Sequence, residues 1–442
     1  MSQGLRYRAQ RLLKNHAFNL VVVLALTSGI GAHNTWSLSQ DVRARVAQSK
    51  PKARESPRLE SPRIAALERE VKAVNRAALR QFWKEVKGNV PLVESVPGND
   101  QLRLVTFLWR GGPEARDIKL DGIVPHYVHH KPLINLAGTD VWFLTARFPV
   151  ATRCSYGFAG FGDKKSINDP LGSRLVEGDS IVELPGAPPQ PWILVQPEVP
   201  KGVLKHQKIR SEILKEERAV SVYTPAGYNS QETYWVVVLF DGEEYRSIVP
   251  TPIILETLVA AKKIHPLVAL LVDSGKTRDR DLQCSAPFAE FLAKELLPWA
   301  RQRYRISSDP RQTIVGGSSY GGLGAAYCAF RYPEVFGNVL SQSASFGYYP
   351  GWDRDSDRTD SSSYGWLIRQ FVTTTKLPIR FYVEAGLFET HSPRGLLAEN
   401  RRMRDVLEAK GYSIVYSEYA GGHEYLNCRG SLADGLIALA GQ

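Results

Sequence analysis

The sequence predicts an α/β fold with a doubly wound, mostly parallel sheet, preceded by a β-sandwich. Three observations support this. Continuous apolar runs at 235–240 and 266–272 are typical of parallel strands that are covered on both faces. Short β-type runs, without a helix of normal length, fill residues 100–200. A glycine-rich turn at 316–322 stands between a strand pattern and a helix pattern.

The first 32 residues have the organisation of a secretory signal. Four basic residues lie within residues 1–16, residues 17–26 are mostly apolar, and small residues follow up to position 32. We therefore expect export, with residues 17–32 either cleaved or kept as an N-terminal membrane anchor, although they are short for a full span. A buried helix of the globular body is the alternative.

The net charge of +11 is confined to the N-terminal part of the chain. Residues 1–88 hold 17 Lys and Arg against 6 Asp and Glu, and the remaining 39 basic and 39 acidic residues cancel. A neutral body argues against nucleic-acid binding. Residues 33–62 are polar and rich in Ser, Arg, Lys and Pro, so we interpret them as a tether.

A helix is predicted from Ser61 and Pro62, with the serine as cap and the proline in the first turn. One apolar stripe follows at helical spacing: Ile64, Leu67, Val71, Val74, Ala78 and Phe82. We expect this stripe to pack on the body, with a partner helix as the alternative. The predicted organisation is a leader (1–32), a tether and helix (33–80), a β-sandwich domain (81–200) and an α/β domain (201–442).

Strands and helices of the two domains can be placed approximately. The sandwich strands are expected at 102–109, 141–148 and 155–158, and a proline-dense linker at 184–192 ends that domain. In the second domain a helical stretch covers 288–303. Beyond the two apolar runs, further strands of that domain are expected at 313–315, 338–340, 379–383 and 413–419.

The glycine-rich turn reads Gly317-x-Ser319-x-Gly321, which is the pattern of a nucleophile elbow. Residues 312–315 before it favour a strand, and residues 323–330 after it favour a helix. Small residues allow the sharp turn that leaves one serine hydroxyl exposed above the sheet. Ser319 is therefore the predicted nucleophile of an α/β-hydrolase-like domain, and a buried serine in a plain glycine-rich turn is the alternative.

A serine hydroxyl needs a base, and the base needs a group that fixes its tautomer. In α/β-hydrolases the serine is followed along the chain by the acid and then by the histidine. Glu389 and His423 occur in that order after Ser319, and each follows a predicted strand. His423 is the predicted base and Glu389 the predicted acid. The nearby carboxylates that could replace Glu389 are Glu384, Glu399, Asp355 and Asp357.

Two backbone N–H groups are expected to form an oxyanion hole. One belongs to Tyr320, directly after the nucleophile, and the other to the loop after an early strand, where Gly242 stands in an Asp-Gly-Glu sequence. An ordinary strand-to-loop turn is the alternative for Gly242.

The cysteines and histidines give no ligand spacing for a metal, and no cofactor is predicted. Four cysteines could form one or two disulfides in an exported protein: Cys154, Cys284, Cys328 and Cys428. His126, His129 and His130 have no carboxylate or cysteine at ligand spacing, so we interpret them as surface or loop histidines.

Many separated segments resemble, in order, the enterochelin esterase (Fes-type) family. They lie at 82–83, 91–94, 105–110, 169–171, 183–188, 222–228, 278, 281–284, 315–323, 340–343, 384–386 and 421–426. The resemblance implies a sandwich that helps to enclose the substrate and an esterase domain that hydrolyses catecholate siderophores. It also implies that Arg278 contacts an anionic catecholate, with a surface salt bridge as the alternative.

The chain departs from the family pattern at three places near the expected site. These are Asn427 with the displaced Cys428, Ser285, and Gly347 with Tyr348. The resulting prediction is an exported serine esterase that acts on a siderophore or another aromatic ester. The alternatives are a feruloyl-type or general carboxylester hydrolase, and a non-catalytic siderophore-binding protein.

Overall fold

The computed structural model describes residues 60–160, 166–172, 174–351, 364–390 and 395–442. The predicted leader, 1–32, and most of the predicted tether lie outside the described residues. Within the described part of the chain, no helix combines the length and apolar character needed to cross a membrane.

The predicted N-terminal helix is two helices, α2 (Pro62–Lys72) and α3 (Arg76–Val86). The Ser61 hydroxyl caps α2 by accepting the Ile64 N–H at 3.2 Å, as predicted. The prediction of one continuous apolar stripe is wrong at its centre, because Val74 adopts a left-handed φ of 57° and its side chain is 75% exposed. Asn75 then caps α3. Apolar residues of both helices pack against the first sheet of the sandwich.

Two antiparallel sheets of four strands form the sandwich. The first has the order β1 (Leu92–Val96), β2 (Asn99–Arg110), β5 (Val141–Pro149), β4 (Ile134–Asn135). The second has the order β3 (Lys119–Gly122), β6 (Arg153–Ala159), β8 (Asp179–Glu183), β7 (Leu175–Val176). Phe107, Phe148 and Phe158 fill the core between them. The three predicted runs fall in β2, β5 and β6, and the short strands were not predicted.

An eight-stranded sheet organises the second half of the chain, as the fold class predicted. Its order is β16 (Ser413–Tyr419), β15 (Arg380–Gly386), β14 (Asn338–Gln342), β13 (Thr313–Ser318), β11 (Trp235–Phe240), β12 (Leu267–Val272), β10 (Glu216–Thr224), β9 (Val203–Ser211). The strands from β16 to β12 run parallel, whereas β10 is antiparallel to both β12 and β9. The antiparallel strands β10 and β9 at this edge of the sheet were not predicted from the sequence.

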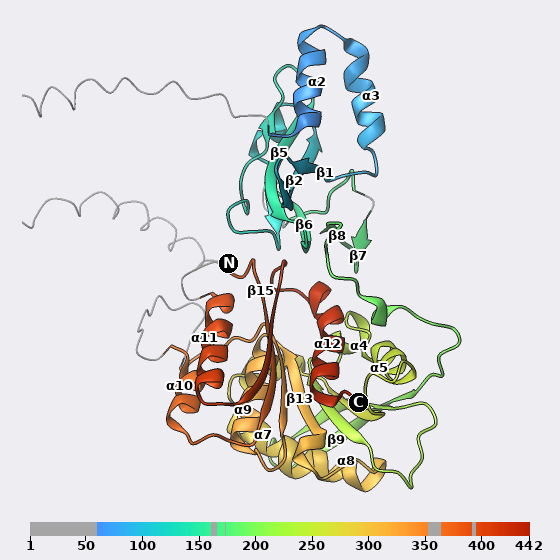
Figure 1. Cartoon of the computed structure of the whole chain (residues 1–442), viewed down its shortest axis with the longest axis vertical. Coiled ribbons are helices and arrows are strands. Elements are labelled where there is room, and N and C mark those ends of the chain that lie inside the picture. Colours follow the sequence, from blue (N-terminus) through green and yellow to red (C-terminus); the bar gives the residue numbers. More distant parts are fainter. Residues whose placement is uncertain (1–59, 161–165, 173, 352–363, 391–394) are drawn as a thin grey trace, which may run out of the picture. The chain divides into compact units, whose positions relative to one another are not determined.

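Helices cover both faces of that sheet (Figure 1). They are α4 (Glu244–Ser247), α5 (Thr251–Ala260), α6 (Arg278–Leu282), α7 (Ala286–Phe291), α8 (Leu297–Tyr304), α9 (Tyr320–Arg331), α10 (Trp366–Thr373), α11 (Leu396–Ala409) and α12 (Tyr425–Ala440). The predicted helix 288–303 is α7 and α8, joined by a π-helical turn at Leu292–Leu296. Short 3₁₀ turns occur at Pro113–Asp117, Pro191–Ile193, Gly275–Thr277 and Pro310–Gln312.

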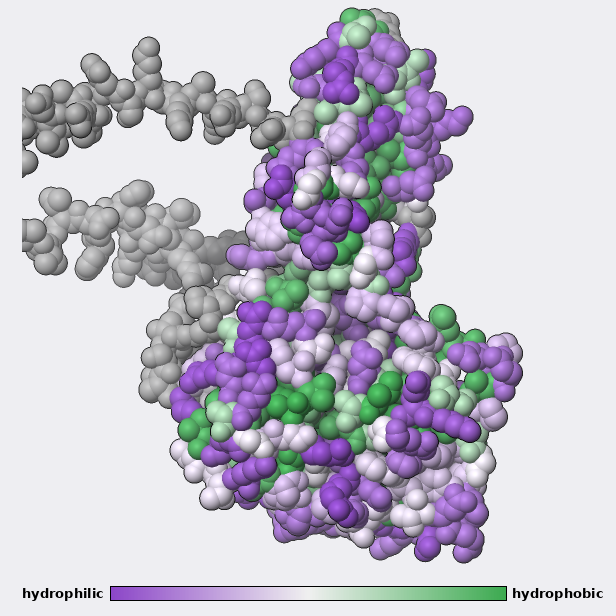
Figure 2. All heavy atoms as spheres, viewed as in Figure 1, coloured by the Kyte–Doolittle hydropathy of each residue, from purple (hydrophilic) through white to green (hydrophobic). Residues whose placement is uncertain are grey.

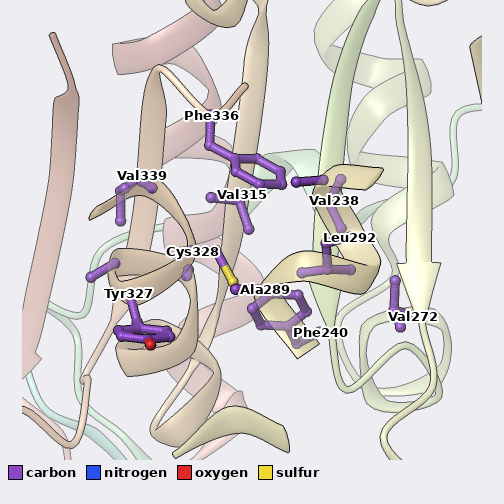
Figure 3. Close-up of a cluster of buried hydrophobic side chains, with 14 of the residues drawn as sticks. Val238, Phe240, Val272, Ala289, Leu292, Val315, Tyr327, Cys328, Phe336 and Val339 are labelled. Atoms are coloured by element: carbon purple, nitrogen blue, oxygen red, sulfur yellow. The ribbon is translucent and has the colours of Figure 1, made fainter. Parts of the chain in front are cut away.

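Alternate residues of the central strands serve two separate cores. Val236, Val238 and Phe240 of β11 join the core beneath α7–α11 (Figure 3), whereas Val237 and Leu239 join the core beneath α5 and α12. This explains why β11 reads as a continuous apolar run: the side chains of a strand alternate between faces, and both faces are buried.

Hydrophilic and hydrophobic side chains are interspersed over the face of the molecule that Figure 2 shows. The cysteines bear on the disulfides that the sequence allows. All four cysteines are free, and three of them are buried. The one or two disulfides that the sequence allows are therefore not formed in this structure, and Cys154, Cys328 and Cys428 are part of the hydrophobic cores.

Candidate active site

Ser319 lies on a strained turn between β13 and α9, at the carboxyl end of a central strand. Its φ of 61° and ψ of −120° are unfavourable for a residue with a side chain. Backbone hydrogen bonds hold this conformation, from Ser319 N–H to Gln342 O at 3.0 Å and from Ser345 N–H to Ser319 O at 3.1 Å. A side chain at Gly317 would meet the Gly321 Cα at 2.9 Å, so the turn requires a glycine there, whereas a side chain at Gly321 would make only ordinary contacts, the nearest at 3.7 Å.

A second serine, Ser345, lies next to the predicted nucleophile. Its Oγ is 3.3 Å from the Ser319 Oγ. Ser345 follows β14, the strand beside β13 in the sheet. Ser345 was not predicted from the sequence. Its position could have indicated it, because it follows a predicted parallel strand and the ends of neighbouring parallel strands lie close together.

His423 and Glu389 are in contact. The His423 Nδ1 lies 3.3 Å from the Glu389 Oε1, and the Glu389 side chain is 2% exposed. The Tyr419 hydroxyl approaches the same Oε1 at 3.5 Å. Among the described residues no direct hydrogen bond joins Ser319 to His423, and catalytic contacts of this kind often tighten only around substrate.

The other carboxylates considered for the acid differ in position. Glu384 accepts hydrogen bonds from Ser431, Tyr382 and Gln342 at 2.6, 3.0 and 3.2 Å, and burial raises its pKa to about 7. Glu399 lines the cavity described below. Asp355 and Asp357 lie outside the described residues.

The two predicted oxyanion donors, the backbone N–H groups of Tyr320 and Gly242, differ in their surroundings. Tyr320 begins α9 directly after Ser319. The Gly242 N–H, however, donates to Val272 O at 3.0 Å and extends the pairing of β11 with β12. It is therefore not available to a substrate oxygen, which corrects that prediction. The next amide in the loop, that of Glu243, donates to no described residue.

Arg278 forms a bidentate ion pair with Asp241. Its Nε and Nη2 each donate at 2.7 Å, and the Asp241 side chain is only 2% exposed. The guanidinium also lies 5.9 Å from the centre of the Tyr320 ring. Arg278 is not among the residues that line the cavity. Its predicted contact with substrate stays a prediction, and the structure adds a role in holding the loop after β11.

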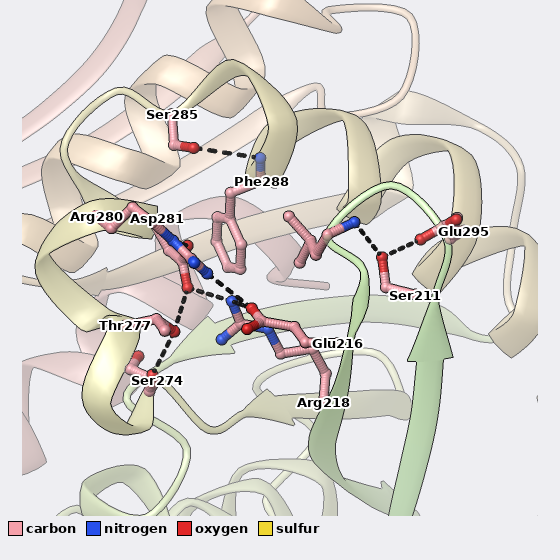
Figure 4. Close-up of polar contacts among 11 residues, drawn as sticks. Ser211, Glu216, Arg218, Ser274, Thr277, Arg280, Asp281, Ser285, Phe288 and Glu295 are labelled. Carbon is pink, nitrogen blue, oxygen red and sulfur yellow. Dashed lines mark hydrogen bonds and ion pairs between the residues drawn. The ribbon is translucent and has the colours of Figure 1, made fainter.

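The short helix α6, which begins at Arg278, is itself fixed by buried charge. Asp281 pairs with Arg218, and it also accepts from Thr277 at 2.7 Å and from Arg280 at 2.9 Å (Figure 4). Both Arg218 and Asp281 are buried. Arg278 is thus presented to Asp241 from a rigid segment.

Arg278→Ala is expected to destabilise the protein by about 1–3 kcal/mol, because it leaves a buried carboxylate without its charged donor. Equal losses in activity on an anionic siderophore and on a neutral short-chain ester would show that the ion pair with Asp241 is the whole role of Arg278. Thermal unfolding and the two kcat/KM values measure this.

The matched control is Arg311→Ala. Arg311 pairs with Asp309 on the surface and is 84% exposed, so its removal should change stability little. If Arg278→Ala keeps its melting temperature and loses activity only on the anionic substrate, Arg278 is a substrate contact, as the family resemblance implies.

The loop that carries His423 is hydrogen-bonded to strand β6 of the sandwich. Arg153 N–H donates to Ala420 O at 2.9 Å, Ser155 N–H donates to the Glu424 carboxylate at 3.1 Å, and the Asn427 amide donates to Arg153 O at 3.0 Å. Burial raises the pKa of Glu424 to about 7. Asn427, one of the departures from the family pattern, therefore has a structural partner.

A cavity of about 390 Å³ opens beside the His423–Glu389 pair. The β-sandwich contributes Gly122, Ile123, Val124 and His129 to the wall of this cavity. Four aromatic residues, Tyr320, Tyr348, Tyr364 and Phe388, contribute from the α/β part. A side chain at Gly347 would lie 2.4 Å from the Tyr364 hydroxyl, so the glycine at this departure leaves space for that ring.

The elbow serine follows a parallel strand of a doubly wound sheet, and its neighbours Tyr320 and Ser345 share a cavity with a histidine–glutamate pair. This is the architecture of an α/β-hydrolase esterase. Comparison with known proteins agrees. Residues 211–439 match the family described as "Putative esterase", and residues 104–174 match "Enterochelin esterase, N-terminal". The chain belongs to the enterobactin (enterochelin) esterase family and is an ester hydrolase.

Individual relatives resemble the chain over most of its length. The iron(III) enterobactin esterases of Dickeya dadantii and of Escherichia coli O6:H1 are 30% and 31% identical, over 82% and 77% of this chain and 93% and 92% of theirs. Ferric enterobactin esterase from Salmonella typhimurium is a structural neighbour with a TM-score of 0.66 and 28% identity, covering 81% of this chain and 98% of that one. Enterobactin esterase from Shigella flexneri, crystallised in the presence of enterobactin, has a TM-score of 0.65 and 28% identity, covering 81% and 97%.

Proposed function

We propose that the protein is a serine esterase that hydrolyses ester bonds of a ferric catecholate siderophore, or of a related compound, and so aids the release of iron. The observation that carries the proposal is the cavity, in which four aromatic side chains stand beside the His423–Glu389 pair. Relatives that match most of the chain are iron(III) enterobactin esterases.

In the proposed reaction the Ser319 Oγ attacks the ester carbonyl while His423 accepts the serine proton. Glu389 at Nδ1 fixes the tautomer that leaves Nε2 to act as the base. His423 then returns the proton to the leaving alcohol, and water hydrolyses the acyl-enzyme by the same route. The N–H of Tyr320 and, in place of Gly242, that of Glu243 would bind the oxyanion.

The cavity wall favours a substrate with aromatic rings. Tyrosine and phenylalanine side chains offer ring faces and edges for stacked or edge-to-face contacts, which contribute beyond their buried area. The volume of about 390 Å³ lies in the range typical of small-molecule sites.

A substrate panel tests this proposal. The purified protein is incubated with ferric and iron-free enterobactin, the linear trimer and dimer, a feruloyl ester and a p-nitrophenyl ester, and products are identified by mass spectrometry. We expect hydrolysis of the catecholate esters with kcat/KM at least about tenfold above that of the feruloyl ester, a difference of roughly 1.4 kcal/mol.

The Ser319→Ala variant is the control for uncatalysed hydrolysis. Preferred turnover of the feruloyl ester would identify a feruloyl-type or general carboxylester hydrolase instead. Tight quenching of fluorescence by ferric catecholates, with no product from the wild type, would identify a siderophore-binding protein.

We further propose that the protein works outside the cytoplasm, in the periplasm or an equivalent exported location. The support is the sequence of residues 1–32, in which basic residues precede an apolar run. Residues 1–60 fused to a reporter that is active only after export should give activity, and residues 33–60 alone should not. A silent, well-expressed fusion of residues 1–60 would contradict the proposal.

A further inference from the structure

Three potential metal ligands of the sandwich converge beside the cavity, and one of them, His129, lines it. The Asp121 Oδ1 lies 3.0 Å from the His129 Nε2 and 3.1 Å from the His130 Nε2. The three ligand atoms all lie within 4.8 Å of one another. The histidines alone gave no ligand spacing in the sequence, and the structure supplies the missing carboxylate.

The two separations that involve the Asp121 Oδ1 match those inside one coordination sphere. Two ligand atoms that are each about 2.1 Å from a transition ion, at an angle near 90–110°, lie roughly 3.0–3.4 Å apart. Both carboxylate–imidazole distances fall in that interval. An ion could replace the two hydrogen bonds once one of the two stacked imidazole rings turns, because each nitrogen lone pair lies in its own ring plane and the two planes are nearly parallel.

Backbone pairing holds the histidines in place against strand β3. His130 N–H donates to Leu120 O at 2.8 Å, and Leu120 N–H donates to Lys131 O at 3.0 Å. Leu120 directly precedes Asp121, so strand β3 both carries the carboxylate and pairs with the backbone at His130 and Lys131. His130 has a left-handed φ of 58°, and its ring stacks on that of His129 with centroids 3.9 Å apart. The backbone of the cluster is therefore fixed, and metal binding requires rotation of an imidazole ring rather than movement of the chain.

We propose that Asp121, His129 and His130 bind a divalent first-row transition ion such as Zn²⁺, Co²⁺ or Fe²⁺. Two imidazoles and one carboxylate suit these ions, and three protein ligands leave further positions for water or an oxygen ligand. The three side chains are 20%, 25% and 60% exposed, so solvent ions can reach them. His129 also lines the cavity, so the ion would add positive charge to a wall near the proposed substrate.

Metal titration of the full chain tests this site. The protein is purified without a histidine tag, stripped with EDTA and titrated with Co²⁺, whose visible absorption reports the ligand geometry. We expect one Co²⁺ per chain, competition by Zn²⁺, and a higher melting temperature at saturating Zn²⁺, because an ion that binds only the folded state stabilises it.

The deciding variant is His130→Asn, because asparagine tolerates the left-handed backbone at this position. It should weaken Co²⁺ binding at least about tenfold while leaving the metal-free melting temperature nearly unchanged. Asp121→Asn should weaken binding at least as much. His126→Asn is the matched control, from the same loop but outside the cluster, and should bind like the wild type.

Absence of stoichiometric Co²⁺ binding by the wild type would overturn the proposal. So would equal weakening by His126→Asn and His130→Asn, since the ion would then be held elsewhere in the loop. If Asp121→Asn does not fold, the comparison of these two histidine variants still decides.

Discussion

Ser319→Ala and His423→Ala are each expected to lower kcat by roughly 10⁴–10⁶, with little change in melting temperature or in ligand binding. The two residues act in one proton transfer, so the double variant should be little worse than either single one. Single-turnover kinetics with the preferred siderophore ester, together with thermal unfolding, measure both quantities.

The neighbouring serines provide the control for this expectation. Ser318→Ala alters the residue before the elbow serine and should retain most of the activity. An organophosphonate should form its covalent adduct on Ser319, located by peptide mass spectrometry. An adduct on Ser318 or Ser343, or more than about a tenth of wild-type kcat in Ser319→Ala, is incompatible with Ser319 as the nucleophile.

Glu389→Gln is expected to lower kcat by roughly 10²–10⁴, because a neutral amide neither fixes the histidine tautomer in the same way nor stabilises the imidazolium. The protein should remain folded, and KM should change much less than kcat. Steady-state kinetics on one siderophore ester and one neutral ester separate these effects.

Glu384→Gln is the matched comparison, since Glu384 is equally buried but bonded to Ser431, Tyr382 and Gln342 rather than to His423. It should affect stability more than kcat. If Glu384→Gln, and not Glu389→Gln, abolishes turnover in a stably folded protein, the acid has been assigned to the wrong carboxylate.

The features that the sequence predicted well depend on side-chain type and local spacing. Strand β11 was predicted at its observed bounds because both faces of that strand are buried, and the elbow was predicted from a glycine pattern in which Gly317 is required sterically. The helix from Pro62 was correct at its cap but wrong beyond Lys72, because the apolar spacing continues through the turn at Val74.

The features that it missed depend on backbone pairing between distant segments. Whether the Gly242 N–H is available depends on Val272 O, and no residue type records that hydrogen bond. Asp121 meets His129 and His130 because the loop folds back onto β3, a strand too short to be recognised. Ser345 is likewise brought to Ser319 by the order of strands in the sheet.

The hydrogen bonds from strand β6 to the loop carrying His423 have a consequence for inactivation. Arg153 and Ser155 hold the backbone and side chain of that loop from outside the α/β sheet, in addition to the hydrogen bond from Phe388 N–H to Gly421 O within the α/β part. Mild heating or low denaturant that loosens this attachment should silence turnover while the circular dichroism of the sheets persists. The catalytic half-life at elevated temperature therefore reports the hold of the sandwich on one loop rather than the melting of either core.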